Sequence, residues 1–116
     1  VGTLATWWTG IFIVFFLGIV SIKIKSKHHR KAAIKNALLI TFIITIISSL
    51  AGFLVGKFIL SNKNPWPIPE DIIDKKNFII VGSIHNFSYL GGLVGLVLSI
   101  LYLLIVATKQ NRTQLL

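Results

Sequence analysis

Two residue types are missing from this sequence, which contains no cysteine and no methionine. Without cysteine the chain has no disulfide bonds, no thiolate chemistry, no cysteine-ligated zinc and no iron–sulfur cluster. A copper site of the usual soft-ligand kind is excluded too, because its sulfur ligands are missing. Since even the first residue, Val1, is not methionine, we expect the natural protein to begin upstream of it.

Charge is scarce as well, and acidic charge is the scarcest. Charged residues make up 13% of the 116 positions, about half of the usual share, and only three residues are acidic. Apolar residues make up 54%. A surface built from this composition faces lipid rather than water, so we expect an integral membrane protein. The length predicts a single domain over residues 1–116.

The basic residues are gathered rather than spread. Six of the twelve lie in residues 23–36, where no acid offsets them: Lys23, Lys25, Lys27, Arg30, Lys31 and Lys35. This pattern is typical of a cytoplasmic loop and predicts an outside N-terminus and an inside C-terminus. It is not the footprint of a nucleic-acid-binding protein, so we expect no nucleic-acid partner. His28 and His29 share this loop, whose positive field repels divalent cations, so we expect them to face water and anionic headgroups.

Three runs with almost no charge are long enough to cross a bilayer, which takes about 20 apolar residues. They cover residues 4–22, 37–60 and 78–108, and Lys57 is the only basic or acidic residue within them. We therefore predict an all-α fold with three transmembrane helices. The first run lacks the preceding basic segment of a secretory signal peptide, so we expect it to be retained.

The segment between the second and third runs, residues 61–77, is predicted to be the outer loop. Three prolines within five positions hold this chain extended. Trp66 lies between two of them and suits the membrane surface, which places all three tryptophans on the same side. Pro69 is followed by two acids, a pattern typical of a helix start. We expect residues 70–77 to form a short interfacial helix, or the extramembrane beginning of the third span.

Small and polar residues recur at helical spacing in the second and third runs. In the second run they are Thr41, Thr45, Ser48, Gly52 and Gly56, and in the third His85, Ser88, Gly92, Gly95, Ser99 and Tyr102. Lipid gives no reason for such stripes, whereas a neighbouring helix does, because small residues let two backbones approach closely. We therefore predict that these helices pack together through Gly52, Gly56, Gly91, Gly92, Gly95 and Ser99.

His85 is the only histidine within the predicted spans, and it lies about 10 Å beyond Phe78 at 1.5 Å per residue. Ser88 and Tyr89 share its helix face, and Asn86 flanks it. An ionisable group in a span is costly and needs a partner, so these four polar residues form the candidate ligand-binding site. His85 is the candidate ligand if a metal is bound. The alternatives for His85 are a structural hydrogen bond to a neighbouring helix and a proton relay.

No enzyme signature is present, and no catalytic residue or particular cofactor is indicated. We expect a small membrane protein that acts as a non-enzymatic subunit or scaffold of a membrane complex. Its expected partners are the lipid bilayer and a second copy or another membrane protein. The alternative is a membrane protein that binds a ligand or metal through His85, across a homodimer.

Conduction of protons or solutes is less favoured, because the inner half of the third span offers only Ser99 and Tyr102 as polar residues. The richness in Ile, Lys, Asn and Phe is typical of AT-rich bacterial genomes. We therefore expect the bacterial cytoplasmic (inner) membrane as the location.

Overall fold

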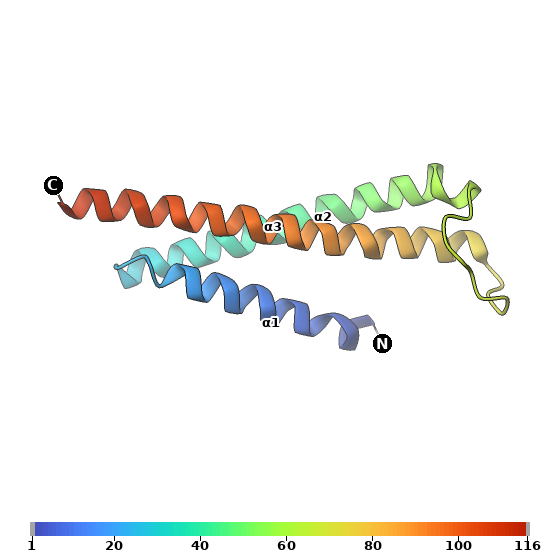
Figure 1. Ribbon diagram of the computed structural model, residues 1–116, viewed down its shortest axis with the longest axis horizontal. Coiled ribbons are helices and arrows are strands. Elements are labelled where there is room, and N and C mark those ends of the chain that lie inside the picture. The colour runs from blue at the N-terminus through green and yellow to red at the C-terminus, as the bar shows by residue number, and fades with distance from the viewer. Residues whose placement is uncertain (1, 116) are drawn as a thin grey trace. The chain divides into compact units, whose positions relative to one another are not determined.

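The computed structural model describes residues 2–115, with side chains over residues 7–113. Within this range the chain is all-helical, with 83% helix and no strands. The elements are α1 (Gly2–Ser21), α2 (Lys27–Phe58), the short 3₁₀ helix η1 (Leu60–Asn62) and α3 (Lys75–Leu115) (Figure 1). The predicted all-α class is confirmed. Val1 and Leu116, the ends of the predicted single domain, lie outside the described residues.

Two of these helices are long and apolar enough to cross a membrane, judged by length and composition. The first candidate span, Lys27–Asn62, is α2 continued through η1. The second, Lys75–Thr113, is α3 over the residues whose side chains are described. The described apolar stretch of α1, Trp7–Ser21, is shorter. The count of three spans and the orientation of the chain therefore stay predictions.

The basic segment expected to be a loop over residues 23–36 is helical over most of its length. Only residues 22–26 lie between α1 and α2, and the first backbone bond of α2 runs from the Arg30 N–H to the Ser26 carbonyl at 2.9 Å. Charge gathers there, but lysine, arginine and alanine are good helix formers, and serine is a preferred residue before a helix start. Positive charge therefore marked the end of the apolar run and not the end of the helix.

The sequence predicted that residues 70–77 form a short interfacial helix or the extramembrane beginning of the third span. Residues 70–74 are not helical, whereas residues 75–77 are the first residues of α3. The Ile72 N–H bonds the Pro69 carbonyl at 3.2 Å in a turn, and α3 begins at Lys75. The better cap is Asp74, whose Oδ1 accepts a bond from the Asn77 N–H at 3.0 Å. An aspartate before the first helical residue satisfies an orphan N–H of the first turn, which Pro69 and the acids after it do not do here.

The chain forms two compact units. Unit 1 comprises Val1–Thr41 and Gly95–Leu116, and it holds α1, the beginning of α2 and the end of α3. Figure 1 draws these segments in blue, cyan and red. Its apolar core takes side chains from all three helices and from the connecting turn: Leu17, Ile24, Ala33, Ala37, Leu103 and Ala107. The turn is held by Arg30, whose guanidinium donates two bonds to the Ile24 carbonyl at 3.0 and 2.7 Å.

Unit 2 comprises Phe42–Val94, and it holds the end of α2, η1, the proline-rich loop and the beginning of α3. Few of its large apolar side chains are buried, and examples such as Phe42 and Leu93 are about 60% exposed, at 62% and 61%. The two helical segments of this unit meet through small residues instead. Their contact positions the candidate site.

Candidate functional site

Two glycines of α2 lie directly against the backbone of α3 in unit 2. A methyl group at Gly52 would lie 2.6 Å from Phe87 Cβ and 2.8 Å from the Ser83 carbonyl oxygen. A methyl group at Gly56 would lie 2.9 Å from Ser83 Cβ and 3.0 Å from Ile80 Cα. Side chains essentially never approach so closely, so the two helices hold this spacing only because both positions are glycine.

On α3 the closest approach falls at Gly91 rather than at its neighbour Gly92. A methyl group at Gly91 would overlap the Ser48 side chain and lie 3.2 Å from the Ile44 carbonyl oxygen. At Gly92 the nearest atom to such a group is Thr45 Oγ1, at 3.9 Å, which is ordinary contact. Gly92 therefore lies at the edge of the contact.

Gly95 and Ser99 make the corresponding contacts in unit 1. A methyl group at Gly95 would lie 2.9 Å from Thr41 Cα. Ser99 is fully buried, and its Oγ donates to the Ala37 carbonyl at 2.7 Å. Its hydroxyl also lies 2.8 Å from Thr41 Oγ1. In this unit the helices are joined by a buried hydroxyl pair as well as by a small residue.

Serine hydroxyls tie α2 to α3 in unit 2. Ser83 Oγ donates to the Gly52 carbonyl at 2.8 Å, and the Ser49 and Ser88 hydroxyls lie 2.7 Å apart. Sequence reasoning missed Ser83 and Ser49. Ser83 could have been found from its position eight residues before Gly91, because this spacing places both residues on one helix face. The predicted stripe was instead drawn through Gly92 and therefore did not include Ser83.

Ser88 is thus occupied at the contact with α2 and not beside the histidine. Its hydroxyl also donates to the Ile84 carbonyl at 2.7 Å. The other three residues of the predicted ligand-binding set, His85, Asn86 and Tyr89, are all exposed on α3. The structure therefore separates Ser88 from the rest of the set.

His85, Asn86 and Tyr89 form a polar patch on the outer face of α3, called the outer patch below. The rings of His85 and Tyr89 meet edge to face, with centroids 4.4 Å apart and planes at 81°. Asn86 and Tyr89 are three residues apart and so are neighbours on the helix surface. Over residues 7–113, no side-chain hydrogen bond of these three residues is formed within the chain. Their donors and acceptors face outward.

Trp66 lies one turn from the outer patch. Its Cζ2 would be 2.9 Å from a methyl group at Gly82, so the indole lies directly on the α3 backbone there. Gly82 is three residues before His85 and four before Asn86, which places all three on neighbouring turns of one face. Sequence reasoning put Trp66 at the membrane surface but did not pair it with Gly82. The available signal was a glycine inside an apolar helix.

The outer patch offers hydrogen bonds rather than a ready metal site. Histidine, asparagine and tyrosine each carry both a donor and an acceptor. Among the described residues no group of three or more histidine, cysteine, aspartate or glutamate side chains is placed to hold a metal ion.

Comparison with known proteins adds no family to this description. No protein-family model, curated protein or solved structure matches the chain.

Proposed function

We propose that this chain spans the bacterial cytoplasmic membrane three times and serves as a non-enzymatic subunit of a membrane complex. The two long apolar helices support the membrane location. The uncharged run of residues 4–22 supports a third crossing by α1, and the basic residues 23–36 support an outside N-terminus and an inside C-terminus. Such a protein acts by binding a partner in the membrane, and the outer patch is the surface proposed to bind it.

The observation that carries this proposal is the exposure of His85, Asn86 and Tyr89 on an otherwise apolar helix. In lipid, donors and acceptors without partners are costly, and a second helix is the usual source of partners. The glycines of α2 and α3 are not available to a partner chain, because they already form the contact between these two helices. Gly52, Gly56, Gly91 and Gly95 are buried. The outer patch is left for another chain.

A second copy of the chain is the partner that the patch fits best. A two-fold axis brings a surface against itself, so the patch must supply both donors and acceptors. The Asn86 amide has both, and so does a neutral His85 ring. Two outer patches can therefore satisfy each other. The same chemistry also suits a polar helix of another membrane protein.

The absence of native cysteine makes disulfide trapping a clean test. Asn86→Cys in the full chain, oxidised in native membranes, is expected to give a covalent dimer. Val81→Cys is the matched control, because Val81 is 63% exposed on the same helix and five residues away, about 140° round the helix axis. It is expected to stay monomeric.

Detergent-corrected mass measurement completes the test. Two chains per particle, falling to one in Asn86→Leu, support the second-copy form. The alternative outcome is that another membrane chain copurifies with the natural protein. If that chain is lost with Asn86→Leu and retained with Val81→Leu, the result supports the subunit role with that chain as partner. One chain per particle, no disulfide at position 86 and no partner that depends on Asn86 contradict the proposed function.

A second candidate is a ligand- or metal-binding protein that uses His85, Asn86 and Tyr89. The position of the Trp66 indole one turn away favours it, because it adds an aromatic surface beside the polar groups. Elemental analysis and an absorption spectrum of the purified protein test this candidate. A bound metal or chromophore that is lost in His85→Ala but kept in Asn86→Leu supports it, and an empty natural protein contradicts it.

A further inference from the structure

Unit 1 carries a strong positive charge with nothing to balance it. It holds eight of the twelve basic residues, and the three acids of the chain all lie in unit 2. The eight are Lys23, Lys25, Lys27, Arg30, Lys31, Lys35, Lys109 and Arg112. Unit 1 has no acidic side chain to neutralise them, so the balancing anions must come from outside this unit.

The charge is concentrated where it is least favourable for the helix. The first turn of α2 contains no acidic residue and reads Lys27, His28, His29, Arg30. The N-terminal end of a helix is the positive end of its dipole, and its first N–H groups have no partners within the helix. Cations at this position are destabilising by themselves. An anion bound there would relieve both the charge and the orphan N–H groups.

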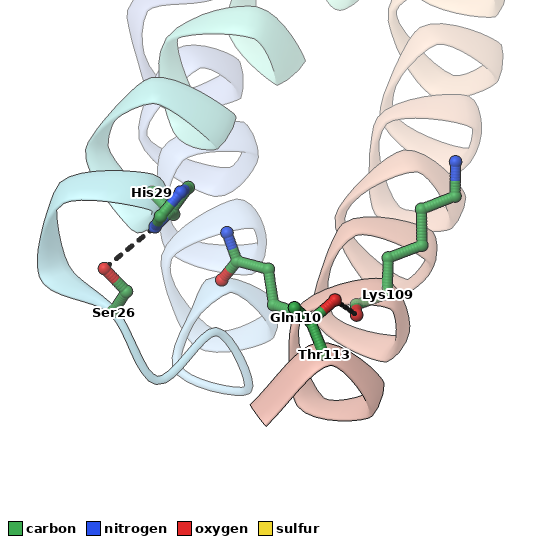
Figure 2. Close-up of a pocket in the computed structure, with 5 residues that line it drawn as sticks. All are labelled: Ser26, His29, Lys109, Gln110 and Thr113. Atoms are coloured by element: carbon green, nitrogen blue, oxygen red, sulfur yellow. Dashed lines mark hydrogen bonds between the residues drawn. The ribbon is translucent and has the colours of Figure 1, made fainter. Parts of the chain in front are cut away.

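A pocket of about 360 Å³ lies beside this turn. It is lined by Ser26 and His29 from the start of α2 and by Lys109, Gln110 and Thr113 from the end of α3. All five lining residues are polar and none is acidic. In Figure 2 the Gln110 side chain points toward His29, whereas the Lys109 side chain extends away from it along α3.

The groups in the pocket define the chemistry of its ligand. His29 Nδ1 is 2.9 Å from Ser26 Oγ, so that nitrogen is occupied and the other ring nitrogen is left for a ligand. Gln110 Oε1 is buried, and it has no hydrogen-bond partner within residues 7–113. An amide presents a donor and an acceptor together. The ligand should therefore be an anion that also carries a hydroxyl donor.

We infer that this pocket binds a phosphate-containing anion that carries at least one hydroxyl, either on the phosphate itself or on the group esterified to it. Phosphate oxygens accept from His29 and from the Gln110 amide nitrogen, both of which line the pocket, and the ligand hydroxyl donates to Gln110 Oε1. Two sources have this chemistry: a glycerol-bearing anionic phospholipid headgroup and free hydrogen phosphate. Only the lipid source rests on the proposed membrane placement.

The experiment compares the two sources on the full-length chain in detergent. Native mass spectrometry measures retention of phosphatidylglycerol against phosphatidylcholine, and calorimetry measures binding of inorganic phosphate. We expect preferential retention of phosphatidylglycerol, reduced about tenfold or more by Gln110→Leu, because the variant loses both a hydrogen bond to the charged phosphate and the bond from the ligand hydroxyl. Neither probe depends on the outer patch, so this test and that of the proposed function fail separately.

Asn111→Leu is the matched control. Asn111 is the next residue, it carries a buried amide oxygen of the same kind, and it does not line the pocket. Both substitutions are neutral, so diffuse attraction to the basic residues is the same in the two variants. Inorganic phosphate binding that depends on Gln110 but not Asn111 supports the pocket with a soluble ligand. Equal effects of the two variants, or no preference for phosphatidylglycerol together with no phosphate binding, overturn the inference.

Discussion

The hydroxyl oxygens of Thr41 and Ser99 lie 2.8 Å apart, and both side chains are buried in unit 1. Each hydroxyl is also within hydrogen-bond distance of the Ala37 carbonyl, at 3.1 Å from Thr41 and 2.7 Å from Ser99. Two hydroxyl protons are thus shared among three close oxygen pairs. Either hydroxyl can donate to the carbonyl if the other is removed.

Because of this redundancy, Ser99→Ala should be costly but tolerated. We expect a loss of about 1 kcal/mol in the free energy of unfolding, since the contacts of the Ser99 hydroxyl with Ala37 and Thr41 both disappear, while Thr41 still donates to the Ala37 carbonyl within α2 and leaves no polar group unpaired. Unfolding in a detergent titration, followed by circular dichroism, measures it. Thr108→Val is the control, because Thr108 is exposed and bonds only within its own helix, to the Leu104 carbonyl at 2.9 Å. A control loss as large as that of Ser99→Ala would contradict the assignment.

Gly91 and Gly92 should respond oppositely to the same substitution. Gly91→Ala places a methyl group on Ser48 and close to the Ile44 carbonyl, so we expect a loss of about 1–3 kcal/mol from overpacking. Gly92→Ala meets nothing closer than 3.9 Å and should be neutral or stabilise by up to about 1 kcal/mol, through better helix propensity. The same titration measures both. Equal losses would show that both glycines face α2 closely.

The sequence predicted that small residues join the second and third helices, but spacing alone did not fix which glycine lies at the contact. The pairs 91–95 and 92–95 both recur at helical spacing, and only the packing partner on α2 separates them. The predicted ends of the helices were wrong for a different reason. Apolar runs mark the part of a helix that suits lipid, whereas caps such as Asp74 and helix-forming lysines set where it begins.

The outer patch was only partly predictable. Its residue types are visible in the sequence, since polar groups in an apolar run stand out. Which of these residues face α2 depends on how the two helices cross. The Ser88 hydroxyl contacts Ser49 of α2 and is therefore not available beside His85. The placement of Trp66 on Gly82 depends on how the proline-rich loop returns to α3, which no local pattern specifies.

Gly82→Ala should displace the Trp66 indole, because the added methyl group would lie 2.9 Å from its Cζ2 atom. In a Trp7→Phe, Trp8→Phe background Trp66 is the only tryptophan. We expect the emission of Trp66 to shift to longer wavelength and its quenching by acrylamide to increase, since the ring loses its contact with α3. Gly92→Ala in the same background should leave both unchanged. An unaltered spectrum in Gly82→Ala would mean that Trp66 does not rest on α3.

Single-cysteine labelling with a membrane-impermeant maleimide tests the three crossings and their direction. Lys63→Cys, in the segment after η1, should react in intact cells, and Lys25→Cys, between α1 and α2, only after permeabilisation. These two positions report the crossing by α2, whose basic end is expected inside. Thr3→Cys tests the crossing by α1. It should react in intact cells, because the uncharged run of residues 4–22 is expected to cross the membrane between an outside residue 3 and an inside Lys25. Protection of both Thr3→Cys and Lys25→Cys would leave α1 on the inner side and reduce the spans to two. Labelling of Lys25→Cys alone in intact cells would reverse the orientation, because the basic segment would then lie outside.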